Sequence, residues 1–286
     1  MLTSSASSGI VEIAKLALEL RAEQSNTHLL KASEFGHYGV VKALLENGVD
    51  INCVGNYDRK TALHCAAENG RKEIVELLVD WKININAANS YGENALLSAA
   101  EKGFVDIVKF LHEQGSSLHE ANSGGYTPLH YACMGGHEKT VEYLLDNGAL
   151  IDAESRVYET PLLQAVQSVE YGIVKMLLQR GANPNIAEAT ERMTPLHIAV
   201  KYRQADMVGL LLSAGANPLA RNVFDETALH IAVAASSVLM CRILMCHGID
   251  SSSPNYLGKT AADAVTKYTD KWQELTQFFL EQAPIY

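Results

Sequence analysis

The sequence predicts an all-α repeat solenoid, and three features of the chain indicate it. A short phrase of the type Thr-Pro-Leu-His returns eight times, beginning at residues 27, 61, 94, 127, 160, 194, 227 and 260. The resulting interval of 33 or 34 residues is typical of stacked repeats rather than of one globular core. Each repeat also holds two short helix-like segments, which would be unstable alone in water. We therefore expect each unit to depend on packing against its neighbours.

The unit that begins at Thr61 shows how one repeat is expected to fold. The hydroxyl of Thr61 can accept a hydrogen bond from a free backbone N–H group at the start of a helix. Gly70 follows at the point where the chain must reverse, because glycine adopts positive φ without strain. The apolar spacing then predicts a second helix that carries Ile74, Val75, Leu77 and Leu78. An extended, turn-rich stretch leads to the next unit.

Residues 127–152 show the repeated pattern most fully, as TPLHYACMGGHEKTVEYLLDNGALID. This pattern resembles the ankyrin repeat, and the resemblance covers about residues 27–286. It implies a stack of antiparallel helix pairs with β-turn loops, curved with a concave face. It also implies that the motif histidines bridge neighbouring units by hydrogen bonds; they are His64, His130, His197 and His230.

The resemblance implies a single ankyrin-repeat domain over residues 1–286. Residues 1–26 are expected to hold an N-terminal capping helix, with an amphipathic stretch at 9–24. Seven repeats then occupy 27–259, and 260–286 form a C-terminal cap. The large apolar residues of this cap have two possible roles, to cover the end of the core or to dock another domain; they are Trp272, Leu275, Phe278, Phe279 and Leu280.

Several glycines of the pattern are replaced by other residues. The position between the two helices is Val169, Arg203 or Ser236 in later units, and Lys82 stands where other units end the second helix with glycine. The turn glycine is absent from four units, where the residue is Arg59, Tyr158, Arg192 or Asp225. A non-glycine residue at positive φ costs about 1 kcal/mol. We therefore expect these turns to shift in geometry and the C-terminal half to be less regular.

Charge and composition restrict the class of partner and the location. With 33 acidic and 23 basic residues, the chain has a net charge of −10, which repels nucleic acid at long range. No run of 18 apolar residues occurs, so no membrane insertion is expected. The five cysteines lack the spacing of a disulfide framework, which favours a reducing compartment, the cytoplasm or the nucleus.

No sequence motif supports catalysis. The chain lacks the glycine-rich phosphate-binding motifs, the G-x-S-x-G nucleophile motif and the H-E-x-x-H zinc motif. Cys241, Cys246 and His247 are the nearest approach to a metal cluster, but their spacing on a helix points the two thiols apart. The sequence therefore predicts no enzyme, no catalytic or cofactor-binding residue and no metal site.

Ankyrin proteins usually meet their partners on the concave side, at the turn tips and the exposed edge of the first helix. The corresponding positions here are rich in aromatic and acidic side chains. The candidate partner-binding residues are Tyr57, Asp58, Glu68, Tyr91, Glu93, Glu101, Tyr126, Met134, Glu159, Met193, Tyr202 and Phe224. Aromatic anchors with an acidic rim suit an extended peptide that carries Arg or Lys beside apolar residues. The alternative is that these tyrosines only pack one turn against the next.

The resemblance and the absence of catalytic motifs together predict a non-catalytic protein–protein interaction module or adaptor, monomeric, that binds a protein or peptide on its concave face. The alternative is an ankyrin scaffold or substrate-recruiting region of a larger protein, such as a ubiquitin-ligase receptor or the regulatory region of an enzyme.

Overall fold

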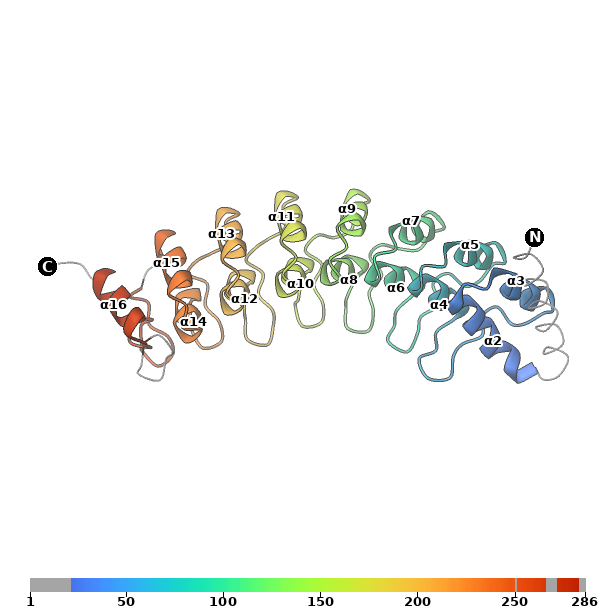
Figure 1. The fold of residues 1–286 in the computed structure, drawn as a ribbon, viewed down its shortest axis with the longest axis horizontal. Helices are drawn as coiled ribbons and strands as arrows, with labels where there is room; N and C mark the ends of the chain where they lie inside the picture. Colours follow the sequence, from blue (N-terminus) through green and yellow to red (C-terminus); the bar gives the residue numbers. More distant parts are fainter. Residues whose placement is uncertain (1–21, 250, 266–271, 283–286) are drawn as a thin grey trace, which may run out of the picture. The chain divides into compact units, whose positions relative to one another are not determined.

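The computed structural model describes residues 22–249, 251–265 and 272–282. The chain divides into two compact units, residues 1–150 and residues 151–286. Each unit consists of stacked helix pairs (Figure 1). The stretch expected to form an N-terminal cap at residues 9–24 lies almost wholly outside the described residues.

Unit 1 contains four helix pairs in its described part. They are α2 (Ala22–Phe35) with α3 (Tyr38–Glu46), α4 (Ala62–Glu68) with α5 (Lys72–Asp80), α6 (Ala95–Glu101) with α7 (Val105–Glu113), and α8 (Pro128–Met134) with α9 (Glu138–Asp146). The first helices of successive pairs pack on one another, and the second helices form a parallel layer. The loops that join the pairs extend past the first helices, away from the second helices (Figure 1).

Unit 2 repeats this arrangement with three pairs and a terminal helix. The pairs are α10 (Pro161–Gln167) with α11 (Tyr171–Gln179), α12 (Pro195–Lys201) with α13 (Ala205–Ser213), and α14 (Ala228–Ala234) with α15 (Val238–Cys246); α16 (Trp272–Gln282) follows. Every first helix of this unit has 7 residues and every second helix has 9, the same lengths as α4 to α9 of unit 1. The expectation of a less regular C-terminal half was therefore wrong for these three pairs. The last repeat does differ, because residues 261–264 form turns and α16 has 11 residues.

The first helices begin at the motif threonine or asparagine, as expected from side-chain capping. The Asn94 side chain accepts a hydrogen bond from the Leu97 backbone N–H at 3.0 Å, and Thr160 does the same for Leu163 at 3.3 Å. The first pair differs, because α2 begins at Ala22 and Thr27 lies within the helix rather than before it.

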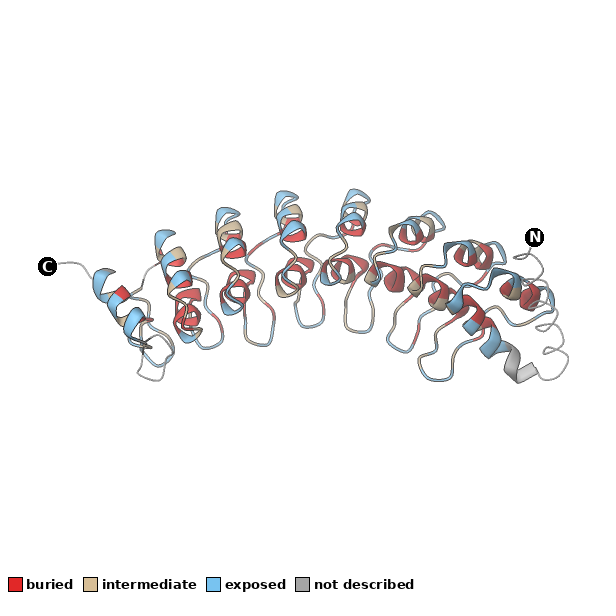
Figure 2. Cartoon of the chain, in the orientation of Figure 1, coloured by how far each residue is buried: buried red, intermediate tan, exposed pale blue. Residues whose placement is uncertain are grey.

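Small and aliphatic side chains fill the space between the helices. Ala66, Ala99 and Ala132 are fully buried, so the backbones of neighbouring first helices can approach closely. Leucines at the second position of the first helices add bulk; Leu63 and Leu129 are both 1% exposed. Figure 2 shows the buried residues concentrated on the helices, whereas exposed residues follow the outer edges of the second helices and the loops.

Three of the motif histidines, His64, His197 and His230, link neighbouring repeats, as the resemblance implied. The Thr61 backbone N–H donates to Nδ1 of His64 at 3.2 Å, so Nε2 carries the proton. Nε2 then donates to the Glu93 carbonyl of the next repeat at 2.8 Å. His197 and His230 make the equivalent bonds to carbonyl oxygens 23 and 29 residues later, each at 3.1 Å. Burial lowers the pKa of His64 and lowers that of His197 to about 4, so both rings are neutral at pH 7.

The replaced glycines do not change the turn geometry, contrary to the expectation from the sequence. All eight replacements lie in the left-handed region, with φ from 53° to 64°; they are Arg59, Lys82, Tyr158, Val169, Arg192, Arg203, Asp225 and Ser236. The aligned glycines also have positive φ, from 69° to 100°. The surrounding repeat therefore imposes the left-handed conformation on these residues, and their backbone is strained as a result.

The two 34-residue repeats place their extra residue in the turn. In the 33-residue repeats the turn closes between residues four apart, such as Asn89 N and Glu93 O at 2.9 Å. In the longer repeats the closing residues are five apart, Gly55 with Lys60 and Glu188 with Met193. The change of period therefore leaves the helices unaltered and widens two of the turns.

The last repeat, which begins at Thr260, keeps the capping interaction with Asp263 in place of the motif histidine. Oδ2 of Asp263 accepts hydrogen bonds from the Thr260 hydroxyl at 2.7 Å and its backbone N–H at 3.0 Å, and these bonds lower the pKa of the Asp263 carboxyl. In α16, Leu275 and Phe278 are buried, while Leu280 is exposed. Burial of the first two favours the interpretation that the aromatic residues of this cap cover the end of the core.

Candidate functional site: the turn tips and first helices

The inner face is the name used here for the turn tips together with the exposed sides of the first helices. Backbone hydrogen bonds join successive turn tips into a ladder. Ser90 N donates to Asp58 O at 2.8 Å, and Ser123 N donates to Tyr91 O at 2.8 Å. Unit 2 continues the same pattern with Ala189 N to Val157 O at 2.9 Å. Because the backbone holds the turns together, the side chains at their tips are not required for this purpose.

Most of the predicted aromatic residues are exposed at these tips. Tyr57 is 98% exposed and Tyr91 is 63% exposed, so neither ring packs turn against turn. In unit 2, Tyr202 is 59% exposed, and Phe224 is 46% exposed with its ring centroid 6.0 Å from that of Tyr256. These exposed rings are available as anchors for a partner.

Tyr126 is different from these residues. It is half-buried, and its ring lies 5.5 Å from the His130 ring and 6.2 Å from the Tyr131 ring. For Tyr126, packing within its own repeat is therefore part of its role, as the alternative interpretation proposed.

The predicted acidic residues of the first turns are paired with lysine. Nζ of Lys60 lies 2.6 Å from Glu68 Oε2 and 3.7 Å from Asp58 Oδ2. Glu101 is paired with Lys102 at 3.0 Å, and both side chains are partly exposed. These ion pairs reduce the local negative charge but leave the carboxylates at the surface.

Glu93 lies in a hydrogen-bond network rather than at a free rim. The Tyr131 hydroxyl donates to Glu93 Oε1 at 2.5 Å, and the Asn89 side-chain amide donates to Oε2 at 2.9 Å. Asn122 in turn donates to the Tyr131 hydroxyl at 2.9 Å. Burial and the bond to Glu93 raise the pKa of Tyr131 above its usual value, so the phenol stays protonated. The network fixes the Glu93 carboxylate on the inner face.

The remaining predicted residues divide between surface and core. Met134 is exposed at the end of α8, and Glu159 accepts hydrogen bonds from the side-chain amides of Gln164 and Gln167 at 3.0 and 3.4 Å. Met193 is only 5% exposed, which makes it part of the core rather than a surface anchor. Met193 immediately precedes the motif threonine, and its backbone N–H donates to Glu188 Oε1 at 2.9 Å.

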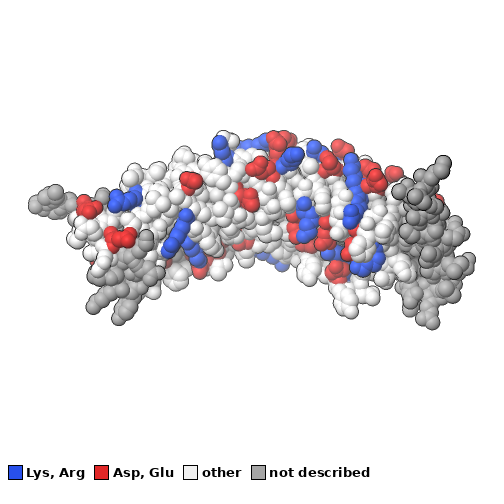
Figure 3. Space-filling model, viewed as in Figure 1, with Lys and Arg blue, Asp and Glu red and all other residues white. Residues whose placement is uncertain are grey.

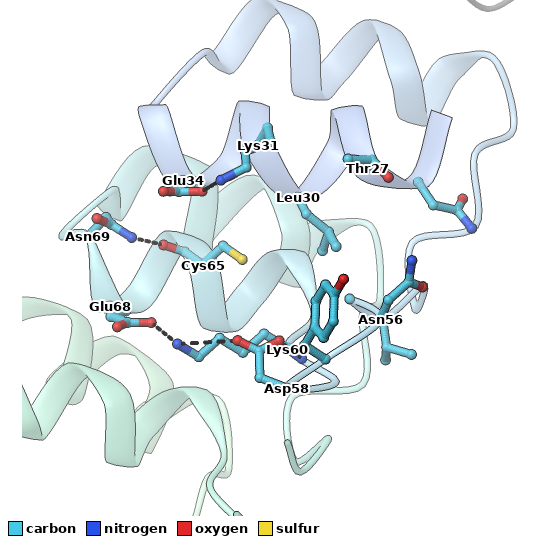
Figure 4. A pocket seen from close by; sticks show the side chains of 14 residues that line it. Thr27, Leu30, Lys31, Glu34, Asn56, Asp58, Lys60, Cys65, Glu68 and Asn69 are labelled. Carbon is cyan, nitrogen blue, oxygen red and sulfur yellow. Dashed lines mark hydrogen bonds and ion pairs between the residues drawn. The ribbon is translucent and has the colours of Figure 1, made fainter. Parts of the chain in front are cut away.

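A groove of about 950 Å³ lies on the inner face of unit 1, between α2, α4 and the first turn. Figure 4 shows the Lys31–Glu34 pair on one side of it and the Lys60–Glu68 pair on the other. Leu30 points from α2 toward the turn. The groove thus has an apolar side chain, Leu30, between two lysine–glutamate ion pairs.

Two smaller hollows lie on the inner face of unit 2, with volumes of about 170 and 340 Å³. They share Glu191, Met193 and Lys201 and therefore adjoin. Sequence reasoning missed several of their lining residues, among them Glu188, Ile198 and Ile231. The 34-residue spacing of this repeat is the signal that could have identified the wider turn at Glu188.

On the face shown in Figure 3, acidic and basic side chains are interspersed over both units. In the part of the chain that the structure describes, no group of three His, Cys, Asp or Glu side chains could hold a metal ion. Within the same residues, no helix is both long and apolar enough to cross a membrane. Cys241 is buried and Cys246 is exposed, so the two thiols face different environments.

Comparison with known structures supports the repeat architecture. The human ASB11 ankyrin repeat domain is 28% identical, with a TM-score of 0.68 over 79% of this chain and 100% of that domain. The ankyrin repeat domain of Bcl-3, a member of the IkappaB protein family, is 27% identical, with a TM-score of 0.67 over 77% of this chain and 99% of that domain.

Curated proteins match over shorter stretches. Protein phosphatase 1 regulatory subunit 12A of Mus musculus is 35% identical over 74 residues, which is 26% of this chain and 7% of that protein. The probable E3 ubiquitin-protein ligase XBOS33 of Oryza sativa subsp. japonica is 34% identical over 96 residues, 31% of this chain and 18% of that protein. The chain thus spans a small part of the length of these relatives.

The family described as "Ankyrin repeats (3 copies)" matches three overlapping stretches, residues 29–122, 96–188 and 162–255. These stretches contain all the helix pairs of both units except the start of α2. They also contain the motif histidines and the turn-tip ladder. The chain belongs to the ankyrin repeat family.

Proposed function

We propose that this chain is a non-catalytic adaptor that binds an extended segment of a partner protein along its inner face. Ankyrin repeats are in general protein-interaction modules, and the curved stack expected from the family would present this face on its concave side. The partner segment carries apolar and basic side chains, the protein acts as a monomer, and it works in the cytoplasm or nucleus. It binds neither nucleic acid nor membrane.

The observation that carries the proposal is the exposure of Tyr57 and Tyr91 at turn tips that backbone hydrogen bonds already hold. An exposed tyrosine ring offers a large apolar area and a hydroxyl at low conformational cost, which is why tyrosine is frequent among interface anchors. Neither ring is needed for the fold, so their role is best explained by a partner.

The test is affinity capture from a cell lysate with the immobilised full chain, followed by quantitative mass spectrometry. The Tyr57→Ala/Tyr91→Ala double variant is compared with wild type and with Tyr38→Ala. Tyr38 is a matched control because it is exposed at the start of α3, on the second-helix layer. Partners retained by wild type and Tyr38→Ala but lost with the double variant support the proposal. Equal capture by all three proteins would place the binding surface elsewhere.

A narrower function is suggested by the curated relatives. One is a regulatory subunit and another is a probable ubiquitin ligase, each much longer than the matched repeats. In that version, the repeats recruit a substrate to a larger protein. Co-purification of a partner together with a phosphatase or ligase component, lost with the same double variant, would favour it.

A further inference from the structure

The two adjoining hollows of unit 2 form one groove with an excess of negative charge. We call it the acidic groove and define it by its carboxylates Glu159, Glu188, Glu191 and Glu226, its single lysine Lys201, and its apolar floor of Met193, Ile198 and Ile231. It runs from the α10 repeat to the α14 repeat, all within unit 2.

The carboxylates of this groove are held mainly by neutral donors. Glu226 accepts a hydrogen bond from the Asn222 side-chain amide at 3.0 Å. Glu188 accepts from the backbone N–H groups of the wide turn, including that of Glu191 at 2.9 Å, and these bonds lower its pKa against the opposing effect of burial. Neutral donors fix a carboxylate in place without cancelling its charge. Lys201 is 3.4 Å from Glu191 and lines the groove as its single cation.

The groove of unit 1 does not share this excess. Its three carboxylates face two lysines, Lys31 at 2.7 Å from Glu34 and Lys60 between Asp58 and Glu68. In that groove the two lysines balance two of the three carboxylates. In the acidic groove Lys201 lies against Glu191, while the carboxylates of Glu188 and Glu226 are held by neutral donors, so an incoming cation would meet an excess of negative charge. Charge complementarity therefore favours unit 2 as the place for a basic side chain.

The floor and rim of the acidic groove suit the remainder of such a side chain. Ile198 and Ile231 are 5% and 9% exposed, so they form an apolar floor beneath the groove but offer little accessible surface. The methylene groups of an arginine or lysine would pack mainly on the exposed rings at its edges. The exposed rings of Tyr202 and Phe224 stand at the edges, where the face of an aromatic ring attracts a cation.

We infer that the acidic groove binds an extended segment of a partner protein through an arginine or lysine flanked by an apolar residue. The cation lies between Glu191 and Glu226, and the apolar neighbour packs beside Phe224. This inference rests on the proposed function and narrows it to one groove and one class of peptide.

The test uses a random 12-residue peptide library displayed on phage and selected on the full chain. Enriched peptides are expected to contain Arg or Lys beside an apolar residue. Glu191→Gln and Glu226→Gln should each weaken the binding of a selected peptide about tenfold, whereas Lys201→Met should strengthen it. Asp206→Asn, an equal loss of charge on the exposed start of α13, should change the Kd by less than about twofold. Fluorescence anisotropy measures the affinities, and circular dichroism checks that each variant folds.

A change in the peptide provides a second test of the inference. Replacing its arginine by citrulline keeps the shape and removes the charge, and should weaken binding to wild type but not to Glu191→Gln/Glu226→Gln. Enriched peptides without a basic residue, or affinities that the glutamine variants leave unchanged, would overturn the inference. If such peptides still depend on Tyr57 and Tyr91, the proposed function stands without the acidic groove. If no peptide is enriched, the inference fails, and lysate capture then decides the proposed function separately.

Discussion

Replacing Val169 by glycine is expected to stabilise the protein. Val169 connects α10 and α11 with φ of 64°, a conformation that is unfavourable for an L-residue and most unfavourable for a β-branched one. The left-handed conformation costs about 1–2 kcal/mol, and glycine avoids it. The extra chain entropy of glycine in the unfolded state offsets about 0.5–1 kcal/mol of this gain. The side chain is 58% exposed, so little buried apolar area is lost. The expected net gain is about 1 kcal/mol.

Urea unfolding followed by circular dichroism measures this difference directly. The midpoint should rise with an unchanged slope, and the melting temperature should rise by about 2–4 °C. Val169→Ala serves as a control, because it removes the β-branch but keeps the Cβ, and should recover only a fraction of the gain. A neutral or destabilising effect of Val169→Gly would refute the conclusion that the repeat imposes a strained backbone at this residue.

Three further predictions follow from the same structure. Gly70→Ala should destabilise the protein by more than Gly48→Ala. Both glycines have positive φ, but the new Cβ at residue 70 would lie 2.6 Å from the Phe104 ring, whereas no atom lies within 4 Å of a Cβ at residue 48. Equal losses of stability in urea unfolding would contradict this. Leu129→Ala should cost about 2–5 kcal/mol through a core cavity, and a loss below about 1 kcal/mol would show that the stack collapses around it. His197 has a pKa of about 4 in the folded protein and about 6.5 when unfolded, so the unfolded state binds the proton more tightly and stability falls as the pH drops from 6.5 toward 4. The loss approaches about 3 kcal/mol near pH 4, and a His197→Asn variant with the same pH dependence as wild type would disprove this assignment.

The architecture could be predicted from the sequence because its determinants are local and repeated. In nearly every unit a threonine or asparagine precedes the first helix, small residues lie within it, and the second helix is aliphatic. The role of His64 followed from the family resemblance, and its bonds to Thr61 and Glu93 confirm it. Such a fold can be predicted because the conformational preferences of the residues agree with the packing between repeats.

The turn geometry could not be predicted from residue preference alone. A penalty of about 1 kcal/mol at Tyr158 suggested a shifted turn. In the structure, the Tyr158 N–H donates to Ser155 O at 3.0 Å, and the neighbouring Val157 carbonyl accepts from the next turn at 2.9 Å. Several such bonds and the packing of the repeat outweigh one unfavourable φ. The same effect of context explains why the helix pairs of unit 2 stay regular although Val169, Arg203 and Ser236 replace the glycine between the helices.

The candidate site was predicted in part. The rings of Tyr57 and Tyr91 are exposed at turn tips, and that of Tyr202 is exposed at the C-terminal end of α12, as the repeat offset predicted. Met193 was misplaced because the offset locates a residue in the turn but does not say which way its side chain points. Its backbone N–H donates to Glu188 as the N–H of Glu93 does to Asn89 in a shorter turn, but its side chain is only 5% exposed. Ile231 belongs to the next repeat along the chain, so its place in the groove beside Met193 could not be predicted from the sequence of one repeat.

Hydrogen–deuterium exchange of the full chain with and without a selected peptide tests the central claim most directly. The claim is that a partner segment binds the inner face. It predicts slower exchange in the turns at residues 188–193 and 222–226 when the peptide is bound, with no change in α11 and α13. Slower exchange confined to those second helices, with unchanged turns, would contradict it.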